Sequence, residues 1–233
     1  MSNEISTQKD VLKKIATEHL LYTNRISSYT KPELFENALW IHAIGMVYDH
    51  ILDYCLKPDD LRLLASLPKP LKAIAREYMK TYDPEALALS VGGGIFVVSN
   101  NLESANPPLF SNLRYVNVDD AAKVRLMKRM DDEFAIYKDV IVTLLDKESI
   151  IAKAEMIALR TSVYEAMKEY PYHDDEMKVL LQLEYPFGTV AKAVEETTPD
   201  DMEKWDLFEA SLDQIHVKNK AQKKKKSHSR DER

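Results

Sequence analysis

The sequence predicts an all-α protein made of two related helical repeat units, with a short irregular or minor β segment between them. Only 5 of the 233 residues are glycine, whereas sandwiches and barrels need many tight turns. Leu, Ala, Glu, Lys and Met, which favour helices or tolerate them well, are abundant. The third observation is that the pattern of residues 30–79 recurs in residues 146–195.

The repeat keeps helix caps, prolines and apolar positions at one constant offset, which places Thr30 opposite Asp146. The identical pairs include Ala38/Ala154, Ile41/Ile157, Tyr48/Tyr164, Tyr54/Tyr170, Asp59/Asp175, Leu64/Leu180, Leu67/Leu183, Pro70/Pro186 and Ala75/Ala191. Two unrelated helical hairpins would not account for paired tyrosines and prolines. We therefore interpret the pattern as an internal duplication.

Helix signals divide the first half of the chain. Apolar residues at helical spacing predict a first helix over residues 7–27. The segment Thr30-Lys31-Pro32-Glu33 then offers a capping threonine, a first-turn proline and a glutamate three residues after the cap. The helix that follows is expected to end near residues 54–56.

The remainder of each repeat is predicted to be two short helices separated by proline. Asp59 and Asp60 follow Pro58, and acids in a first turn oppose the positive end of the helix dipole. Pro68-Lys69-Pro70 ends this helix, and a further helix is expected over residues 71–81.

Residues 83–118 differ from both repeats. They contain Gly92-Gly93-Gly94, then the β-branched and aromatic residues 95–98, which we interpret as a short strand or buried extended segment within a connecting loop. Long helices are expected over residues 119–145 and 200–215. The expected organisation is a first helical unit (1–82), an irregular connection (83–118), a second helical unit (119–216) and a disordered lysine-rich tail (217–233).

Charge is unevenly placed along the chain. Residues 218–233 hold eight basic and two acidic residues, a net charge of +6, which leaves −12 on residues 1–217 of a chain whose total is −6. An acidic body does not suit a folded nucleic-acid-binding face, because it repels phosphates. The tail could contact nucleic acid or another anion through a run of lysines: Lys218, Lys220, Lys223, Lys224, Lys225 and Lys226.

Neither a membrane span nor a signal peptide is expected. No apolar run approaches the length of about 18 residues that a spanning helix needs. The first ten residues lack the basic and apolar regions of a signal peptide, so we expect a cytoplasmic protein with no membrane partner. The one cysteine, Cys55, lies in an apolar run and is expected in the core.

One constellation resembles a metal site. His42, Asp49 and Asp53 fall on one face of their predicted helix, and a histidine with two carboxylates could bind a metal. In the second copy the two acids correspond to Glu165 and Glu169, but the histidine corresponds to alanine. We therefore favour an acidic edge that faces solvent or a partner, and we expect no metal, cofactor or catalytic residue.

Other motifs have structural explanations. His173-Asp174-Asp175-Glu176 is interpreted as a charged helix start, because its counterpart Lys57-Pro58-Asp59-Asp60 shares only the acids. Gly92-Gly93-Gly94 lacks the Lys-Ser or Lys-Thr of a phosphate-binding loop, so we expect a turn or a close backbone approach. The paired tyrosines Tyr48/Tyr164 and Tyr54/Tyr170 are expected to be core residues.

The repeat also resembles a known kind of domain. The start at Thr30-Lys31-Pro32-Glu33, then Asp59-Asp60-Leu61-Arg62-Leu63-Leu64, Lys69-Pro70-Leu71 and the closing Glu77-Tyr78-Met79-Lys80 are similar to an uncharacterised helical family from phages and conjugative elements of Gram-positive bacteria. The second copy departs from this pattern at Asp146-Lys147-Glu148. The resemblance implies a mobile-element context and no particular activity.

Together these features predict a non-enzymatic interaction or accessory protein of a bacterial mobile element. In one version, the acidic body imitates nucleic acid and inhibits a host defence nuclease. The alternative is a nucleic-acid-associated accessory factor that acts through its basic tail. A metal-dependent enzyme using His42, Asp49 and Asp53 is a third hypothesis. The sequence leaves the partner and the oligomeric state open.

Overall fold

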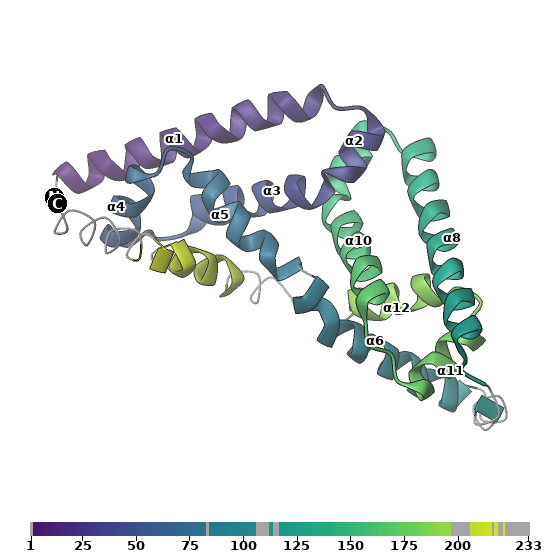
Figure 1. Cartoon of the computed structure of the whole chain (residues 1–233). Coiled ribbons are helices and arrows are strands. Elements are labelled where there is room, and N and C mark those ends of the chain that lie inside the picture. The colour runs from purple at the N-terminus through teal and green to yellow at the C-terminus, as the bar shows by residue number, and fades with distance from the viewer. Residues whose placement is uncertain are drawn as a thin grey trace, which may run out of the picture. The chain divides into compact units, whose positions relative to one another are not determined.

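The computed structural model describes residues 2–82, 84–105, 112–113, 117–196, 206–215, 217–218 and 221, the side chains of 2–7, 81–82, 84–86 and 88 excepted (Figure 1). These residues form helices and connecting turns with no strand among them, so the all-α prediction is confirmed. They separate into two compact units. Unit 1 comprises residues 1–30, 39–81 and 199–233, and unit 2 comprises residues 31–38 and 82–198.

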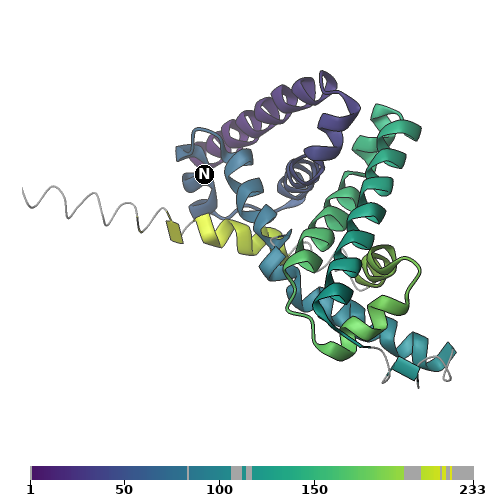
Figure 2. The ribbon, with the colours of Figure 1, turned by 45° about the vertical axis from the view of Figure 1, so that its right-hand side comes forward.

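Unit 1 is organised around its long first helix, α1 (Ser2–Ser27), which packs against α4 (Pro58–Ser66) and α5 (Pro70–Tyr78) (Figure 2). It also holds most of α3 (Ala38–Asp53) and the short helix η1 (Met79–Tyr82). Residues 206–215 are helical, and Phe208 packs its ring against His50 and Tyr54. The buried residues of unit 1 include Val11, Ile15, Ile51, Leu64, Leu71, Ile74 and Tyr78.

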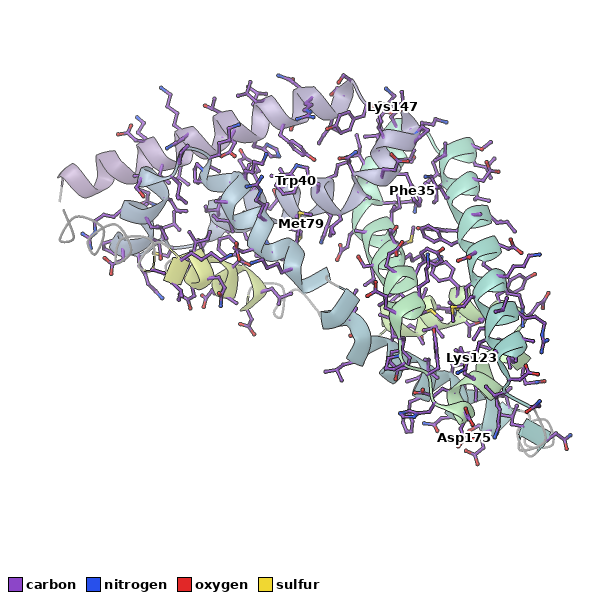
Figure 3. The ribbon with its side chains drawn as sticks, in the orientation of Figure 1. Phe35, Trp40, Met79, Lys123, Lys147 and Asp175 are labelled. Atoms are coloured by element: carbon purple, nitrogen blue, oxygen red, sulfur yellow. The ribbon has the colours of Figure 1, made fainter. Side chains whose placement is uncertain are left out.

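In unit 2, α6 (Pro84–Ala105) packs against α10 (Ala154–Glu169), α11 (Asp174–Gln182) and α12 (Pro186–Glu196) (Figure 1). The long helix α8 (Asp120–Leu144) contacts the same three helices. The short helices α2 (Lys31–Glu36) and α9 (Lys147–Ala152) contact each other, and α2 also contacts α8. Phe35, labelled on α2 in Figure 3, lies 6.2 Å from the ring of Phe134 and 6.0 Å from that of Tyr137.

Helix boundaries follow the spacing of the sequence repeat. The first residues of α2, α3, α4 and α5 are Lys31, Ala38, Pro58 and Pro70, and those of α9 to α12 are Lys147, Ala154, Asp174 and Pro186. Every one of these pairs is separated by the sequence offset between Thr30 and Asp146. The last residues of the first three helices keep the same offset.

The expectation of an irregular segment over residues 83–118 is wrong for residues 84–105, which form the helix α6. Residues 95–98 are neither a strand nor an extended segment; they lie inside the helix α6. Val91, Ile95 and Val98 are buried at helical spacing, and this packing overrides the weak β preference of the segment. Residues 84–105 are therefore part of unit 2 and not an irregular connection, and residues 31–38 also belong to that unit.

Two smaller findings complete the fold. Cys55 is exposed, contrary to the expected core position. Among the helices that the structure describes, none has both the length and the hydrophobicity needed to cross a membrane.

Candidate functional site

Each unit contains a corner where a long helix meets two short ones, and one glutamate closes it. The first N–H groups of any helix lack intrahelical partners. In unit 1, the Glu18 carboxylate accepts hydrogen bonds from the backbone N–H of Leu71 at 3.0 Å and of Lys72 at 2.9 Å, at the start of α5. In unit 2, Glu133 Oε2 accepts one from the N–H of Gly188 at 3.0 Å, at the start of α12.

A basic side chain one turn earlier closes the other end of the corner. Lys14 donates from Nζ to the backbone oxygens of Ala65, at 3.3 Å, and Leu67, at the end of α4. Arg129 donates to the carbonyl oxygens at the end of α11: Leu181 at 3.2 Å, Leu183, and Glu184 at 3.0 Å. Positive charge is favourable there because a helix C-terminus exposes carbonyls and carries a partial negative charge.

Aromatic rings stack directly beside these caps. The imidazole of His19 lies flat on the ring of Tyr48, with centroids 3.8 Å apart and planes 3° from parallel. The ring of Phe134 lies on that of Tyr164 at 4.0 Å and also 3°. Burial lowers the pKa of His19, and the nearby Asp49 carboxylate opposes that effect.

The short helices that precede the corners start in the same way. The N–H of Lys57 donates to Asp60 Oδ2 at 3.0 Å, and the N–H of His173 donates to Glu176 Oε2 at 2.7 Å. The acids predicted to stabilise these helix starts therefore do so, and Glu176 also accepts from the hydroxyl of Tyr170 at 3.0 Å. The histidine-acid cluster is thus part of a helix cap.

Tyr22 and Tyr137 occupy equivalent positions, each about one helical turn after the capping glutamate. The hydroxyls of Tyr22 and Tyr137, together with Glu133 Oε1, are buried and have no hydrogen-bond partner among the described residues. Burial raises the pKa of Tyr137 to about 12 and raises that of Glu133, against the opposing influence of the Gly188 N–H and Arg129. Buried groups enclosed by rings are poorly placed to exchange protons with a substrate.

A shallow groove follows the outside of the unit 1 corner. It has a volume of about 430 Å³ and runs between α1 and the junction of α4 with α5. A second hollow of about 310 Å³ continues along α5. Their charged lining is mostly basic, with Lys13, Lys14, Lys69, Lys72 and Arg76 against Asp10 and Glu18.

The predicted acidic edge is exposed in both copies. Asp49 and Asp53 lie on α3 in unit 1, and Glu165 and Glu169 lie on α10 in unit 2. Within the described part of the chain, none of these four carboxylates forms an ion pair, whereas Asp59 pairs with Arg62 and Asp175 with Lys178. Whether this edge faces a partner stays a prediction.

The three side chains of the metal hypothesis do not come together. His42 is buried, with Nε2 3.5 Å from the hydroxyl of Tyr78, while Asp49 and Asp53 are exposed on the same helix. Over the described ranges, no group of three or more His, Cys, Asp or Glu side chains has a metal-binding arrangement.

The paired tyrosines are only partly core residues. Tyr164 is buried, whereas Tyr48, Tyr54 and Tyr170 are half-buried. The tail is mostly beyond the described residues: Lys220 and residues 223–226 fall outside them, and Lys218 forms an ion pair with Glu77.

Sequence reasoning missed the corner residues, although a signal was present. The pairs Lys14/Arg129, Glu18/Glu133, His19/Phe134 and Tyr22/Tyr137 keep a common spacing that is one residue shorter than the offset of the repeat. An ungapped alignment of the repeat therefore does not extend into α1 and α8. A motif of a basic residue, glutamate four residues later, an adjacent ring and tyrosine three residues further would have found both.

No protein-family model, no curated protein and no solved structure matches this chain. The resemblance to a mobile-element family therefore remains a prediction that rests on the repeat's own residues.

Proposed function

We propose that the chain is a non-enzymatic protein–protein interaction scaffold, formed by duplication of a five-helix module represented by α1 to α5 and by α8 to α12. The observation that carries the proposal is the use of the polar side chains that recur between the copies. The Lys14/Arg129, Glu18/Glu133 and Asp60/Glu176 pairs all cap helix ends. A duplicated active site would instead bring several recurring polar groups together in one pocket.

The acidic edge supplies the binding surface in this proposal. Asp49 and Asp53 recur as Glu165 and Glu169, although none of the four forms an ion pair with a described residue. Exposed carboxylates one helical turn apart attract basic surfaces and steer their approach. We expect the partner to be a basic protein, in line with the net charge of −12 on residues 1–217.

Charge reversal tests the edge directly. Wild-type protein and the variants D49K/D53K and E165K/E169K are used for quantitative affinity capture from host extract. Partners specific to the edge are lost with one or both variants and retained by D132K/D139K, which reverses two exposed acids on α8. Identical captured proteins for all four would contradict the proposal.

A narrower version is that the partner is a host defence nuclease, with the acidic body imitating nucleic acid. The mobile-element resemblance motivates this version, since such elements meet host nucleases. Size-exclusion chromatography with purified nucleases that carry basic substrate clefts gives a co-eluting, salt-sensitive complex if it holds. Separate elution of every nuclease at low salt would exclude it.

The alternative function is a nucleic-acid accessory role for the tail. The charge distribution favours it, because eight of the 32 basic residues lie in residues 218–233. Lysine–phosphate contacts release counterions, so affinity falls steeply as salt rises. Deleting residues 218–233 then abolishes salt-sensitive DNA or RNA binding. The comparison variant Lys218→Ala, which removes one tail lysine together with its ion pair to Glu77, leaves most of that binding.

A further inference from the structure

α6 exposes large apolar side chains that nothing in the described part of the chain covers. Leu89 is 88% exposed and Phe96 is 67% exposed, although neighbouring Leu87, Val91 and Ile95 are buried. Leu89, Gly93 and Phe96 are four and three residues apart, which places them on one face of the helix. Opposite this face, α6 packs against α10 and α12 (Figure 1).

The three glycines of α6 have different surroundings. A Cβ atom on Gly92 would lie 2.7 Å from the hydroxyl oxygen of Tyr170, and one on Gly94 would lie 3.0 Å from Val194 Cγ2. A side chain at either position would therefore require Tyr170 or Val194 to shift. A Cβ on Gly93 would meet no atom within 4 Å. Glycine lowers the stability of a helix interior. No contact among the described residues of unit 2 explains why glycine occupies position 93.

The order large, small, large around Gly93 fits a second helix that crosses there. Glycine lets two helix backbones approach closely, and the larger residues on either side then interlock. Under a two-fold axis through Gly93, Leu89 of one copy faces Phe96 of the other. The pattern is thus complementary to itself when the two helices run antiparallel.

The distribution of charge also favours a second copy of this chain as the partner. α6 carries no charged residue from Ala86 to Leu102, whereas residues 1–217 have a net charge of −12. Two copies of so acidic a chain repel each other least where charges are absent. We propose that the exposed face of α6 binds the same face of a second copy and forms a two-fold symmetric dimer.

Sedimentation velocity of the full-length chain over a concentration series tests the proposal. The mass rises from one chain to two with concentration, and Phe96→Glu holds it at one chain. The matched control Ile136→Glu alters a residue on α8 that is 65% exposed, and it dimerises like the wild type. A wild type that stays monomeric throughout, a dimer that tolerates Phe96→Glu, or loss of the dimer with Ile136→Glu would overturn it.

Substitutions at Gly93 separate self-association from folding. Gly93→Ala raises the melting temperature measured at low concentration, because alanine favours helix, yet it weakens dimerisation at least tenfold. In a Cys55→Ser background, Gly93→Cys forms a disulfide-linked dimer on mild oxidation, since Cβ atoms on the two-fold axis fall within the ~4 Å that a disulfide requires. Ile136→Cys in the same background does not. Equal cross-linking of both cysteine variants, or unchanged dimerisation of Gly93→Ala, would contradict the two-fold contact.

Discussion

The corner closed by Glu18 in unit 1 and the corner closed by Glu133 in unit 2 use the same helix caps but present different surfaces. At the exposed junction, Pro68 and Lys69 of the first corner correspond to Glu184 and Tyr185 of the second. Inside, a glutamate and a basic side chain hold the helix ends in both. The two corners therefore differ where side chains face water and are alike where side chains satisfy buried backbone groups.

The outer surfaces of the two corners therefore suit different partners. Lys69, Lys72 and Arg76 give the first corner a basic groove. In the second, Lys72 is replaced by Gly188, and the exposed Glu184 and Tyr185 add an acid and a ring. If both copies bind, we expect them to bind different targets.

The largest expected effect comes from removing the capping glutamates. Glu18→Ala and Glu133→Ala each leave part-buried N–H groups without an acceptor, which costs about 2 kcal/mol of unfolding free energy. Urea unfolding followed by circular dichroism measures both losses. Thr17→Ala, at an exposed neighbour of Glu18, is the control and changes little. A loss of unfolding free energy in only one of the two variants would show that the two glutamates are not equivalent.

Removing the basic caps is expected to have a smaller effect that differs between the copies. Arg129 donates to three carbonyls and Lys14 to two, and a guanidinium fork holds several acceptors in fixed geometry. Arg129→Ala should therefore cost roughly 1.5 kcal/mol and Lys14→Ala about 1 kcal/mol. Arg129→Lys should behave like a second Lys14. Urea unfolding measures these losses as well. A larger loss of unfolding free energy for Lys14→Ala than for Arg129→Ala would contradict this prediction.

A glycine that the second copy lacks gives a stabilising prediction. Gly45 of α3 corresponds to Thr161 of α10, and a Cβ at Gly45 would meet no atom within 4 Å. Gly45→Ala should therefore raise the unfolding free energy by about 0.5–1 kcal/mol. Gly94→Ala is the matched opposite, because its Cβ would press on Val194 at 3.0 Å. Destabilisation by Gly45→Ala would show that the copies differ more at this position than their backbones indicate.

The smallest expected effect is on the pH dependence of stability. Burial lowers the pKa of His19 below its ordinary value of 6.5, so the unfolded chain binds the proton more readily than the folded one. The contribution of His19 is therefore complete above that value and is lost as pH falls through the lowered pKa. His19→Phe places at this position the residue type found at the equivalent Phe134. It should therefore reduce the pH dependence of the melting temperature below neutral pH. An unchanged pH profile in His19→Phe would exclude His19 as the source.

The sequence predicted helix content and the starts of α2, α4, α5, α9, α11 and α12, because caps and prolines are local signals. It did not predict the breaks before α3 and α10, where a single helix was expected. It predicted α6 wrongly, since the glycines and β-branched residues of that segment become helical only through packing on α10 and α12. It also missed the corners. Glu18 and Leu71 are 53 residues apart, and nothing local to either indicates the other.

The placement of α2 has a consequence for synthesis on the ribosome. Leu34 and Phe35 are buried, and Phe35 rests against rings of α8 that belong to the same unit. At usual elongation rates, α8 emerges on the order of ten seconds after α2. During that interval Phe35 lacks the rings of α8 that pack against it, so the nascent chain exposes a large apolar side chain. Its folding yield in the cell therefore depends on how the first half of the chain is protected until the second half has been made.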